Sequence, residues 1–245
     1  MESETDQITL YKKDDIIYAI SKLLEYYNES KNKQATIKAA HLLMDKVRCT
    51  DMDVIKLESN FIEEILFILN EDGTKTIAED VFFRLRELRA DLKGVSFDGV
   101  YVSYMRPKGF KGEIIINPQK VPDKDVSGID FNGVKLIGDY DEVNGLYADP
   151  CFDDCIIYES SFKGCIGNIV IALDKIKSHA CLCNFTGVKL TGKMDNYKLF
   201  ASYYEDDNGN GIYLTNYEDY ESEKKVAPKK KSRVLTFFDR FKGNN

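Results

Sequence analysis

Three short segments after residue 92 repeat one pattern, and this repetition constrains the fold more than any other feature of the chain. They lie at residues 94–103, 128–138 and 182–192, and each reads small or apolar, polar, Phe, polar, Gly, Val, any residue, aliphatic. The Phe and the aliphatic residue are five positions apart in every copy. The pairs are Phe97 with Val102, Phe131 with Leu136, and Phe185 with Leu190. Such self-similarity is typical of repeat architectures.

A five-residue period has a simple structural interpretation. If five residues form one flat side of a coil, four sides close a square turn of about 20 residues, and stacked turns bury a continuous column. The central Phe or Leu points inward, and so does the residue two positions earlier, which must be small. Cys155, Ser160 and Cys165 recur at this spacing around Phe162, and Cys183 occupies the same place in the third copy. A buried thiol acts as a small hydrophobe, so we expect these cysteines to pack in the interior.

The stretch at residues 116–141 adds a second signature, because it places Asn117, Pro118 and Gln119 ahead of the second Phe segment. Together these segments resemble the pentapeptide-repeat proteins, and within them a divergent bacterial subgroup whose pentads are interspersed with Asn-Pro-Gln. The resemblance covers about residues 92–195. It implies a right-handed quadrilateral β-helix that usually lacks catalysis and often binds proteins. Some members mimic DNA with an acidic surface, and others belong to secreted bacterial effectors.

The copies of the repeat are unevenly spaced. Phe97, Phe131 and Phe185 are separated by 34 and 54 residues, and neither number is a multiple of 20. Loops must therefore leave the coil, and an irregular β-helix is expected. The residues predicted to form its repeat core are Phe97, Val102, Phe131, Leu136, Phe162, Phe185 and Leu190.

The first ninety residues have the apolar spacing of helices instead. Apolar residues recur every three to four positions over residues 14–27, 33–47, 51–69 and 77–92. Thr76 and Glu79 have the spacing of a capping box, which predicts the start of the last helix. Short links between four helices indicate an antiparallel bundle or a pair of helical hairpins. The predicted fold class is α+β, with an N-terminal helical bundle followed by an irregular right-handed quadrilateral β-helix of the pentapeptide-repeat type.

The distribution of charge divides the chain further. The formal net charge is −7, but residues 224–245 contain eight basic residues and one acid, so this end carries +7 and residues 1–223 carry −14. An acidic body of this kind is not expected to bind nucleic acid directly. The predicted organisation is a helical domain at 1–91, the β-helix with a terminal hairpin at 92–217, a charged linker at 218–232 and a basic amphipathic tail at 233–245.

The tail would place apolar and basic residues on opposite faces of a short helix. Such a segment can lie on an anionic membrane surface or enter a groove of a protein partner. A third interpretation is that its phenylalanines cap the open end of the β-helix. The residues expected to contact a partner or a membrane are Lys229, Lys230, Lys231, Arg233, Phe237, Phe238 and Phe241.

Motifs for catalysis and cofactor binding are sparse. The chain has two histidines in different regions, no Gly-x-Ser-x-Gly elbow and no phosphate-binding glycine loop. Residues 206–211 begin like an EF-hand loop, but its twelfth position is Tyr217, so a hairpin turn is the better interpretation. His179, Cys181 and Cys183 could form part of a zinc corner, although interior packing already explains Cys183. We predict no catalytic residue, no metal site and no cofactor.

The preferred function from sequence is a non-enzymatic protein–protein interaction or scaffold module with a protein partner. The alternatives are an acidic DNA-mimic regulator of a nucleic-acid enzyme and a secreted bacterial effector with an unrecognised active site. The acidic start lacks a secretory signal, and the six cysteines include no C-x-x-C pair. A cytoplasmic location with reduced thiols is therefore expected, with peripheral membrane association through the tail as an alternative.

Overall fold

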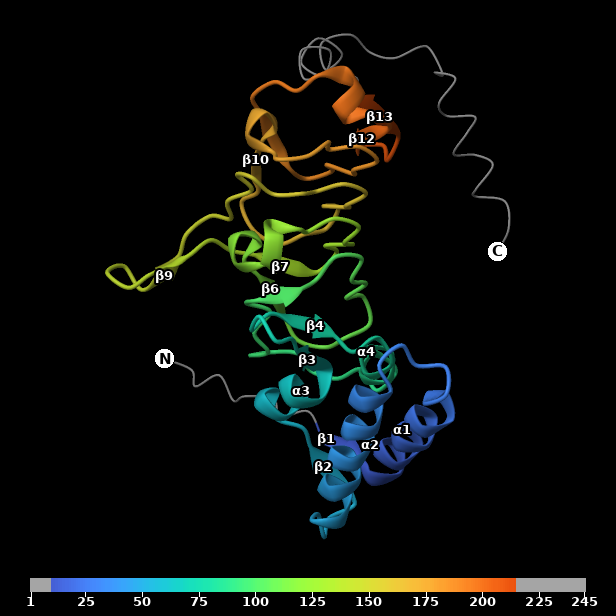
Figure 1. Cartoon of the computed structure of the whole chain (residues 1–245). Helices are drawn as coiled ribbons and strands as arrows, with labels where there is room; N and C mark the ends of the chain where they lie inside the picture. The colour runs from blue at the N-terminus through green and yellow to red at the C-terminus, as the bar shows by residue number, and fades with distance from the viewer. Residues whose placement is uncertain (1–9, 215–245) are drawn as a thin grey trace.

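Figure 1 shows the computed structural model of the protein, which describes residues 10–214. The α-helices lie at one end of the molecule, and from there the chain winds into stacked layers of short strands and turns. Strands β12 (Ser202–Glu205) and β13 (Gly211–Leu214) lie at the opposite end of the stack. Between the two ends, one hairpin projects to the side.

The helical end contains four α-helices within the described residues. They are α1 (Lys13–Tyr26), α2 (Lys33–Arg48), α3 (Ser59–Leu66) and α4 (Glu79–Glu87). The first two cover the residues that the apolar spacing predicts. Asn32 begins α2 because its side-chain oxygen accepts a hydrogen bond from the Ala35 N–H at 3.0 Å, which satisfies a backbone donor that the helix itself cannot pair.

The prediction of one helix over residues 51–69 is wrong. Val54–Lys56 form strand β2, antiparallel to β1 (Leu10–Lys12), and Phe67–Leu69 form strand β3, antiparallel to β4 (Lys75–Ile77). Short apolar runs have no distinct period, and here pairing with a neighbouring strand decides their conformation. The first ninety residues are therefore not the predicted helical bundle, because short strands alternate with the helices.

The predicted capping box of Thr76 and Glu79 is also wrong. Thr76 lies in β4 and pairs in parallel with Tyr101 of β5 (Val100–Tyr101), so its backbone belongs to a sheet. Ala78 precedes the first residue of α4 and provides no side-chain cap. The helix ends at Glu87, five residues before the predicted end at 92.

The layered part contains the remaining strands. They are β6 (Ile114–Ile116), β7 (Val134–Leu136), β8 (Tyr140–Asp141), β9 (Leu146–Tyr147), β10 (Val170–Ala172) and β11 (Lys189–Thr191). Strands β6 and β7 pair in parallel, as do β10 and β11, whereas β8–β9 and β12–β13 are antiparallel hairpins. Short 3-10 turns occur at Pro118–Lys120, Pro122–Lys124, Leu173–Lys175 and Asn196–Leu199.

The prediction of a right-handed quadrilateral β-helix of the pentapeptide-repeat type is wrong. Across residues 10–214, strands of two to four residues form six separate sheets of two or three strands, with no closed or solenoid β-helix, so the fold is mixed α/β. The steps between layers are unequal. Asp130 pairs with Ser161 after 31 residues, Ser161 with Asn184 after 23, and Asn184 with Tyr203 after 19. A coil with constant five-residue sides requires equal steps, and insertions between the layers prevent them.

The repeated segments instead encode one kind of turn. In each copy the Phe carbonyl accepts a hydrogen bond from the Val N–H three residues later, at 3.1 Å for Val100, 2.9 Å for Val134 and 3.0 Å for Val188. The glycine before each Val has a φ of 72°, 77° or 83°, which is the third position of a type II turn and favours glycine. The polar residue before each Phe then accepts a hydrogen bond from the N–H two positions later. These acceptors are Ser96, Asp130 and Asn184.

The core runs without interruption from Tyr11 in the helical end to Leu214 in β13. In the layered part, phenylalanine rings stack along its axis, with centroids 5.0 Å apart for Phe131 and Phe162 and 5.8 Å apart for Phe162 and Phe185. None of the α-helices between residues 10 and 214 is long and apolar enough to cross a membrane.

Candidate functional site

The projecting hairpin formed by β8 and β9 is the candidate functional site. The two strands pair antiparallel, with Tyr140 opposite Tyr147. Two backbone hydrogen bonds close its base: the Gly138 N–H donates to the Ala148 carbonyl at 2.8 Å, and the Ala148 N–H donates to the Asp139 carbonyl at 2.9 Å. No other strand in the described part of the chain pairs with it, and it leaves the stack sideways in Figure 1.

The tip of this hairpin is held by Asp141. One oxygen of its carboxylate accepts hydrogen bonds from the backbone N–H groups of Val143 at 2.9 Å and Asn144 at 3.2 Å, and the other accepts one from the Asn144 side chain at 2.6 Å. These bonds, with the side chain of Asn144 as the largest cause, hold the pKa of Asp141 below its usual value. Gly145 follows with a φ of 67° and donates its N–H to the Asp141 carbonyl at 2.8 Å. The ionised carboxylate therefore orders the turn.

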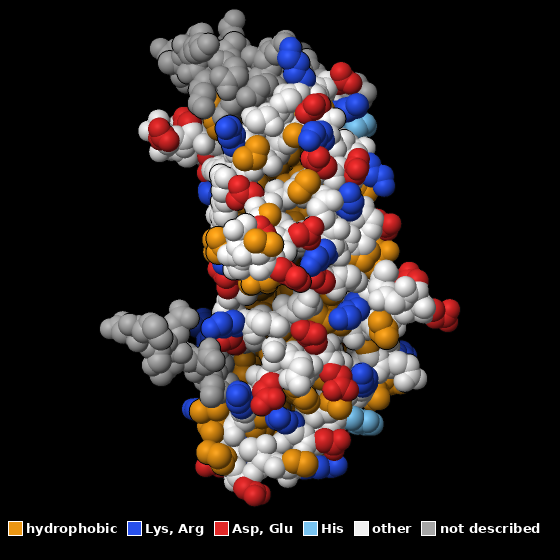
Figure 2. All heavy atoms as spheres, turned by 90° about the vertical axis from the view of Figure 1, so that its left-hand side faces the viewer, with side chains coloured by type: hydrophobic (Ala, Val, Ile, Leu, Met, Phe, Trp, Pro, Cys, Tyr) orange, Lys and Arg blue, Asp and Glu red, His pale blue; other side chains and the backbone are white. Residues whose placement is uncertain are grey.

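The hairpin carries large apolar side chains that the rest of the described structure leaves exposed. The exposed fraction is 51% for Tyr140, 93% for Val143, 68% for Leu146 and 55% for Tyr147. The two tyrosine rings contact each other edge to face, with centroids 5.1 Å apart. Figure 2 views the molecule from the side on which the hairpin projects, and hydrophobic side chains gather there. Contiguous exposed apolar groups of this kind mark interaction sites more often than single exposed residues do.

Acidic residues accompany these apolar side chains. Residues 138–149 contain Asp139, Asp141, Glu142 and Asp149 and no Lys or Arg. Three of the four carboxylates have a structural hydrogen bond: Asp139 accepts one from Asn117, Asp149 accepts one from Asn168, and Asp141 holds the tip. Glu142 is exposed and has no side-chain hydrogen bond with the described residues. The hairpin is thus both apolar and anionic.

The uneven spacing of the repeats predicts that loops leave the coil, but it does not predict this hairpin. The sequence does contain a signal, because the Asn144-Gly145 pair lies between two short segments that each contain a tyrosine, Tyr140-Asp141 and Leu146-Tyr147. Asn-Gly is a strong indicator of a tight hairpin turn. The large step of 31 residues from Asp130 to Ser161 contains this hairpin, which identifies it as the insertion.

The residues predicted to form the repeat core are all buried. Their exposed fractions range from 0% for Val102, Phe131 and Phe162 to 5% for Leu190. The others are Phe97, Leu136 and Phe185. They form packing contacts and bring no reactive groups together. The predicted contact residues of the tail, from Lys229 to Phe241, lie outside the described residues.

The cysteines are free thiols with differing surroundings. Burial raises the pKa of both Cys155 and Cys183 to about 12, which makes them poor nucleophiles at neutral pH. Cys183 also donates a hydrogen bond to the Ile157 carbonyl of the adjacent layer at 2.7 Å, and Ser160 donates one to the Val126 carbonyl at the same distance. The small interior residues Ser160 and Cys183 therefore connect neighbouring layers by hydrogen bonds, and they also fill space in the core.

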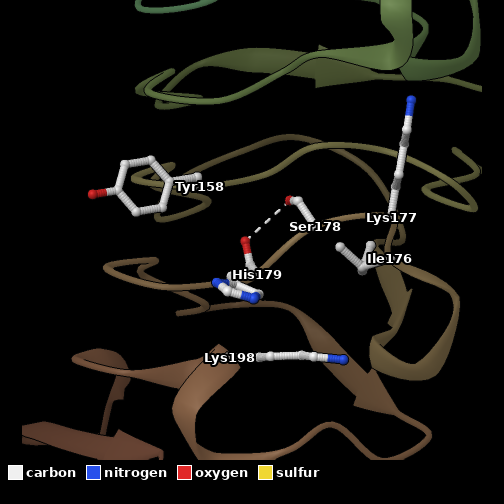
Figure 3. Close-up of a pocket in the computed structure, with 6 residues that line it drawn as sticks. All are labelled: Tyr158, Ile176, Lys177, Ser178, His179 and Lys198. Carbon is white, nitrogen blue, oxygen red and sulfur yellow. Dashed lines mark hydrogen bonds between the residues drawn. The ribbon is translucent and has the colours of Figure 1, made fainter.

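A shallow pocket of about 490 Å³ lies elsewhere on the layers. It is lined by Tyr158, Ile176, Lys177, Ser178, His179 and Lys198. Figure 3 shows that its polar groups do not converge: the Tyr158 hydroxyl and the two lysine ammonium groups point to different sides, and the Ser178 hydroxyl donates to the His179 carbonyl at 3.1 Å. Convergent groups are what a catalytic site needs, and this pocket does not provide them.

The two metal motifs considered from sequence also have structural explanations. Within residues 10–214, no group of three or more His, Cys, Asp or Glu side chains is placed to hold a metal ion. Residues 206–210 connect β12 to β13, which begins at Gly211, and Asp206 accepts hydrogen bonds from the N–H groups of Asn208 at 2.9 Å and Asn210 at 2.8 Å. The Asp206 carboxylate thus orders a turn in the same manner as Asp141.

Comparisons with protein-family models, curated proteins and solved structures give no match to this chain. The candidate site is therefore defined by its own geometry.

Proposed function

We propose that this protein is a non-enzymatic interaction module that contacts a protein partner through the β8–β9 hairpin. The observation that supports this proposal is the exposure of Tyr140, Val143, Leu146 and Tyr147 on a hairpin whose base and tip are both held by hydrogen bonds. A rigid hairpin loses little conformational entropy when it binds, and tyrosines contribute strongly to binding energy at interfaces.

Recognition would occur mainly through side chains. Each strand of the hairpin has only two residues, so its open edges offer few backbone groups for an added strand. Full burial of an exposed apolar side chain of this size contributes about 1.5–3 kcal/mol. A partner with an apolar pocket could enclose the tyrosine pair, while the stacked layers hold the hairpin at a fixed distance from the helical end.

Charge supports this function better than the DNA-mimic alternative. DNA mimicry needs an uninterrupted row of acids, but lysines pair with many acids of the layered part. The pairs are Lys120 with Asp98, Lys124 with Asp154, Lys135 with Glu113, Lys163 with Glu205, and Lys175 with Asp153. Figure 2 shows basic and acidic side chains intermixed on the face it displays. A reducing cytoplasmic environment suits the free thiols of this proposed module.

The proposal can be tested with a photoreactive amino acid in place of Val143, the most exposed residue of the hairpin. Irradiation in the native host should join this position to a specific protein segment. Leu146→Ser should abolish the crosslink because it removes apolar contact area. Leu69→Ser is the matched control, because Leu69 is 70% exposed on another antiparallel hairpin, β3–β4, against 68% for Leu146. Equal crosslinking in both variants, or none from the parent protein, would refute the proposal.

A further inference from the structure

We infer that the β8–β9 hairpin is the docking site for residues 229–242 of the same polypeptide. This inference rests on the proposed function, because residues 229–242 would occupy the same apolar surface of the hairpin that the protein partner contacts. The two segments carry opposite charge. Residues 138–149 have four acids and no basic residue, whereas residues 229–242 have six basic residues and one acid. Opposite charges of this density attract each other and set the orientation of the two segments.

Both segments also contain clustered apolar residues. The hairpin exposes an edge-to-face tyrosine pair together with Val143 and Leu146. Residues 229–242 contain three phenylalanines, at 237, 238 and 241, within five positions. Aromatic rings pack favourably in edge-to-face geometry, and the open faces of the tyrosines are available for it. An anionic apolar hairpin and a cationic apolar segment are complementary in both respects.

The length of the connecting chain also bears on this docking. The described structure ends at Leu214, the last residue of β13, which pairs with Ser202 of β12. The hairpin leaves the stack after the segment of Asp130, which lies three pairings from Tyr203 of β12. Neighbouring paired strands are about 4.8 Å apart, so the hairpin layer lies about 14 Å along the stack from β12. The 14 residues from 215 to 228 can span about 45 Å when extended. The connecting chain is therefore about three times as long as the displacement along the stack, and the remaining length is available to pass around the stack to the hairpin.

Charge also argues against the other occupants of this surface. Two copies of the hairpin would bring eight carboxylates together, and an anionic membrane would repel the hairpin in the same way. A membrane could bind residues 229–242 alone, but the apolar side chains of the hairpin would then stay exposed. The segment of this polypeptide satisfies both surfaces at once.

The absence of tryptophan from the chain allows a direct experiment. The full-length protein carrying Phe238→Trp has a single indole in the segment in question. We expect its emission at shorter wavelength than in the urea-unfolded protein, with protection from acrylamide quenching. Adding Glu142→Lys should shift the emission toward that of the unfolded chain, because this variant reverses a charge beside the apolar residues without breaking a described hydrogen bond.

Two further variants make the test specific. Glu71→Lys is the matched control, because Glu71 is an exposed glutamate in the turn of β3–β4, and the emission should not change. Combining Glu142→Lys with Lys230→Glu and Arg233→Glu should restore the short-wavelength emission. Circular dichroism of each variant tests whether the fold is intact. Docking within one chain gives emission independent of protein concentration, whereas docking onto a second chain gives a shift that grows with concentration and a dimer in sedimentation. The first result supports the inference, and the second would contradict docking within the same polypeptide.

Three further results would overturn the inference. One is a solvent-exposed indole at every concentration. Another is a protected indole that Glu142→Lys leaves protected, which would place the segment elsewhere on the protein. The third is an indole protected only after addition of vesicles of phosphatidylserine and phosphatidylcholine. Crosslinking from position 143 separates the two proposals: a crosslink to a different protein together with an exposed indole refutes this inference and keeps the proposed function.

Discussion

The hairpins β3–β4 and β8–β9 have the same local chemistry and opposite surroundings. In each, an aspartate at the turn accepts backbone hydrogen bonds: Asp72 from the Thr74 N–H at 2.9 Å, and Asp141 from the Val143 N–H at the same distance. In each, a glycine with positive φ follows, with 83° at Gly73 and 67° at Gly145. Local sequence therefore forms both hairpins, because turn residues specify the geometry of the turn.

The neighbours of the two hairpins differ. Strand β4 pairs with β5, and the Phe67 ring of β3 meets the buried Phe97 ring edge to face at 5.5 Å. Strands β8 and β9 pair only with each other in the described structure, and every residue from 139 to 149 is exposed. Phe67, Ile68 and Ile77 of β3–β4 pack against the core, whereas the apolar residues of β8–β9 do not. Apolar side chains that folding does not require are available for binding.

The largest expected effect comes from the residue that covers β3. Phe97 is 2% exposed, and Phe97→Ala should lower the free energy of unfolding by about 3–5 kcal/mol, because it removes a buried ring and leaves a cavity. Urea denaturation followed by circular dichroism measures this loss. Val143→Ala on the β8–β9 hairpin should change the same quantity by less than about 0.5 kcal/mol. Similar losses in both variants would contradict the comparison.

Aromatic residues within the hairpins should differ in the same direction by a smaller amount. Phe67 is partly buried, so Phe67→Ala should cost about 1–3 kcal/mol of unfolding free energy, less than a fully buried phenylalanine. Tyr147→Ala should cost less than about 0.5 kcal/mol, since its main ring contact is Tyr140 within the same hairpin. A loss above this value for Tyr147→Ala would mean that the β8–β9 hairpin unfolds together with the core.

Glycine substitutions separate local from global effects more finely. A Cβ at Gly73 would meet no atom within 4 Å, and one at Gly145 would meet only the Tyr140 hydroxyl at 3.8 Å, so the cost of Gly→Ala arises from the positive φ. That cost is about 1–2 kcal/mol for each turn. Gly73→Ala should lower the global unfolding free energy by this amount. Gly145→Ala should instead speed amide hydrogen exchange at Val143 and Asn144 only. Equal global losses would refute the distinction.

The sequence predicts local geometry in this protein better than it predicts long-range arrangement. The Phe-x-Gly-Val segments have the glycine that a type II turn requires and a polar side chain that caps it, and both effects act within five residues. The continuous β-helix inferred from them is absent from residues 10–214, because layer continuity depends on equal steps between segments. Nothing in a single turn determines the length of the chain before the next one.

The helical end and the candidate site show the same limit. Residues 54–56 and 67–69 have apolar patterns compatible with a helix, and only their partners β1 and β4 make them strands. The Asn144-Gly145 pair predicts a hairpin, but whether Tyr140 and Tyr147 are covered depends on which layers lie beside it. A hairpin that packs on the core and one that remains open have the same turn signal, so the site could be recognised only from exposure in the folded structure.

The smallest effect that we expect is on pH dependence. Side-chain and backbone hydrogen bonds lower the pKa of both Asp72 and Asp141, with the Thr74 hydroxyl and the Asn144 amide as the largest respective causes. A carboxylate whose pKa is lower in the folded state stabilises that state above the unfolded pKa of about 3.9, and this contribution is lost as the pH falls through the folded pKa. The Asp141 turn should therefore open only when the pH falls below the lowered pKa of the folded state, which lies under about pH 4.

Carboxyl chemical shifts from NMR titration measure this effect for each aspartate. Asn144→Ala should raise the pKa of Asp141 toward its usual value and leave that of Asp72 unchanged. Thr74→Val should raise the pKa of Asp72 toward its usual value and leave that of Asp141 unchanged. The consequences should differ between the hairpins. Protonation of Asp72 should reduce global stability, because β4 is part of a larger sheet, whereas protonation of Asp141 should change only the amide shifts of its own turn. If both protonations reduced global stability alike, the β8–β9 hairpin would be a structural element of the core, and its exposed tyrosines would need an explanation other than binding.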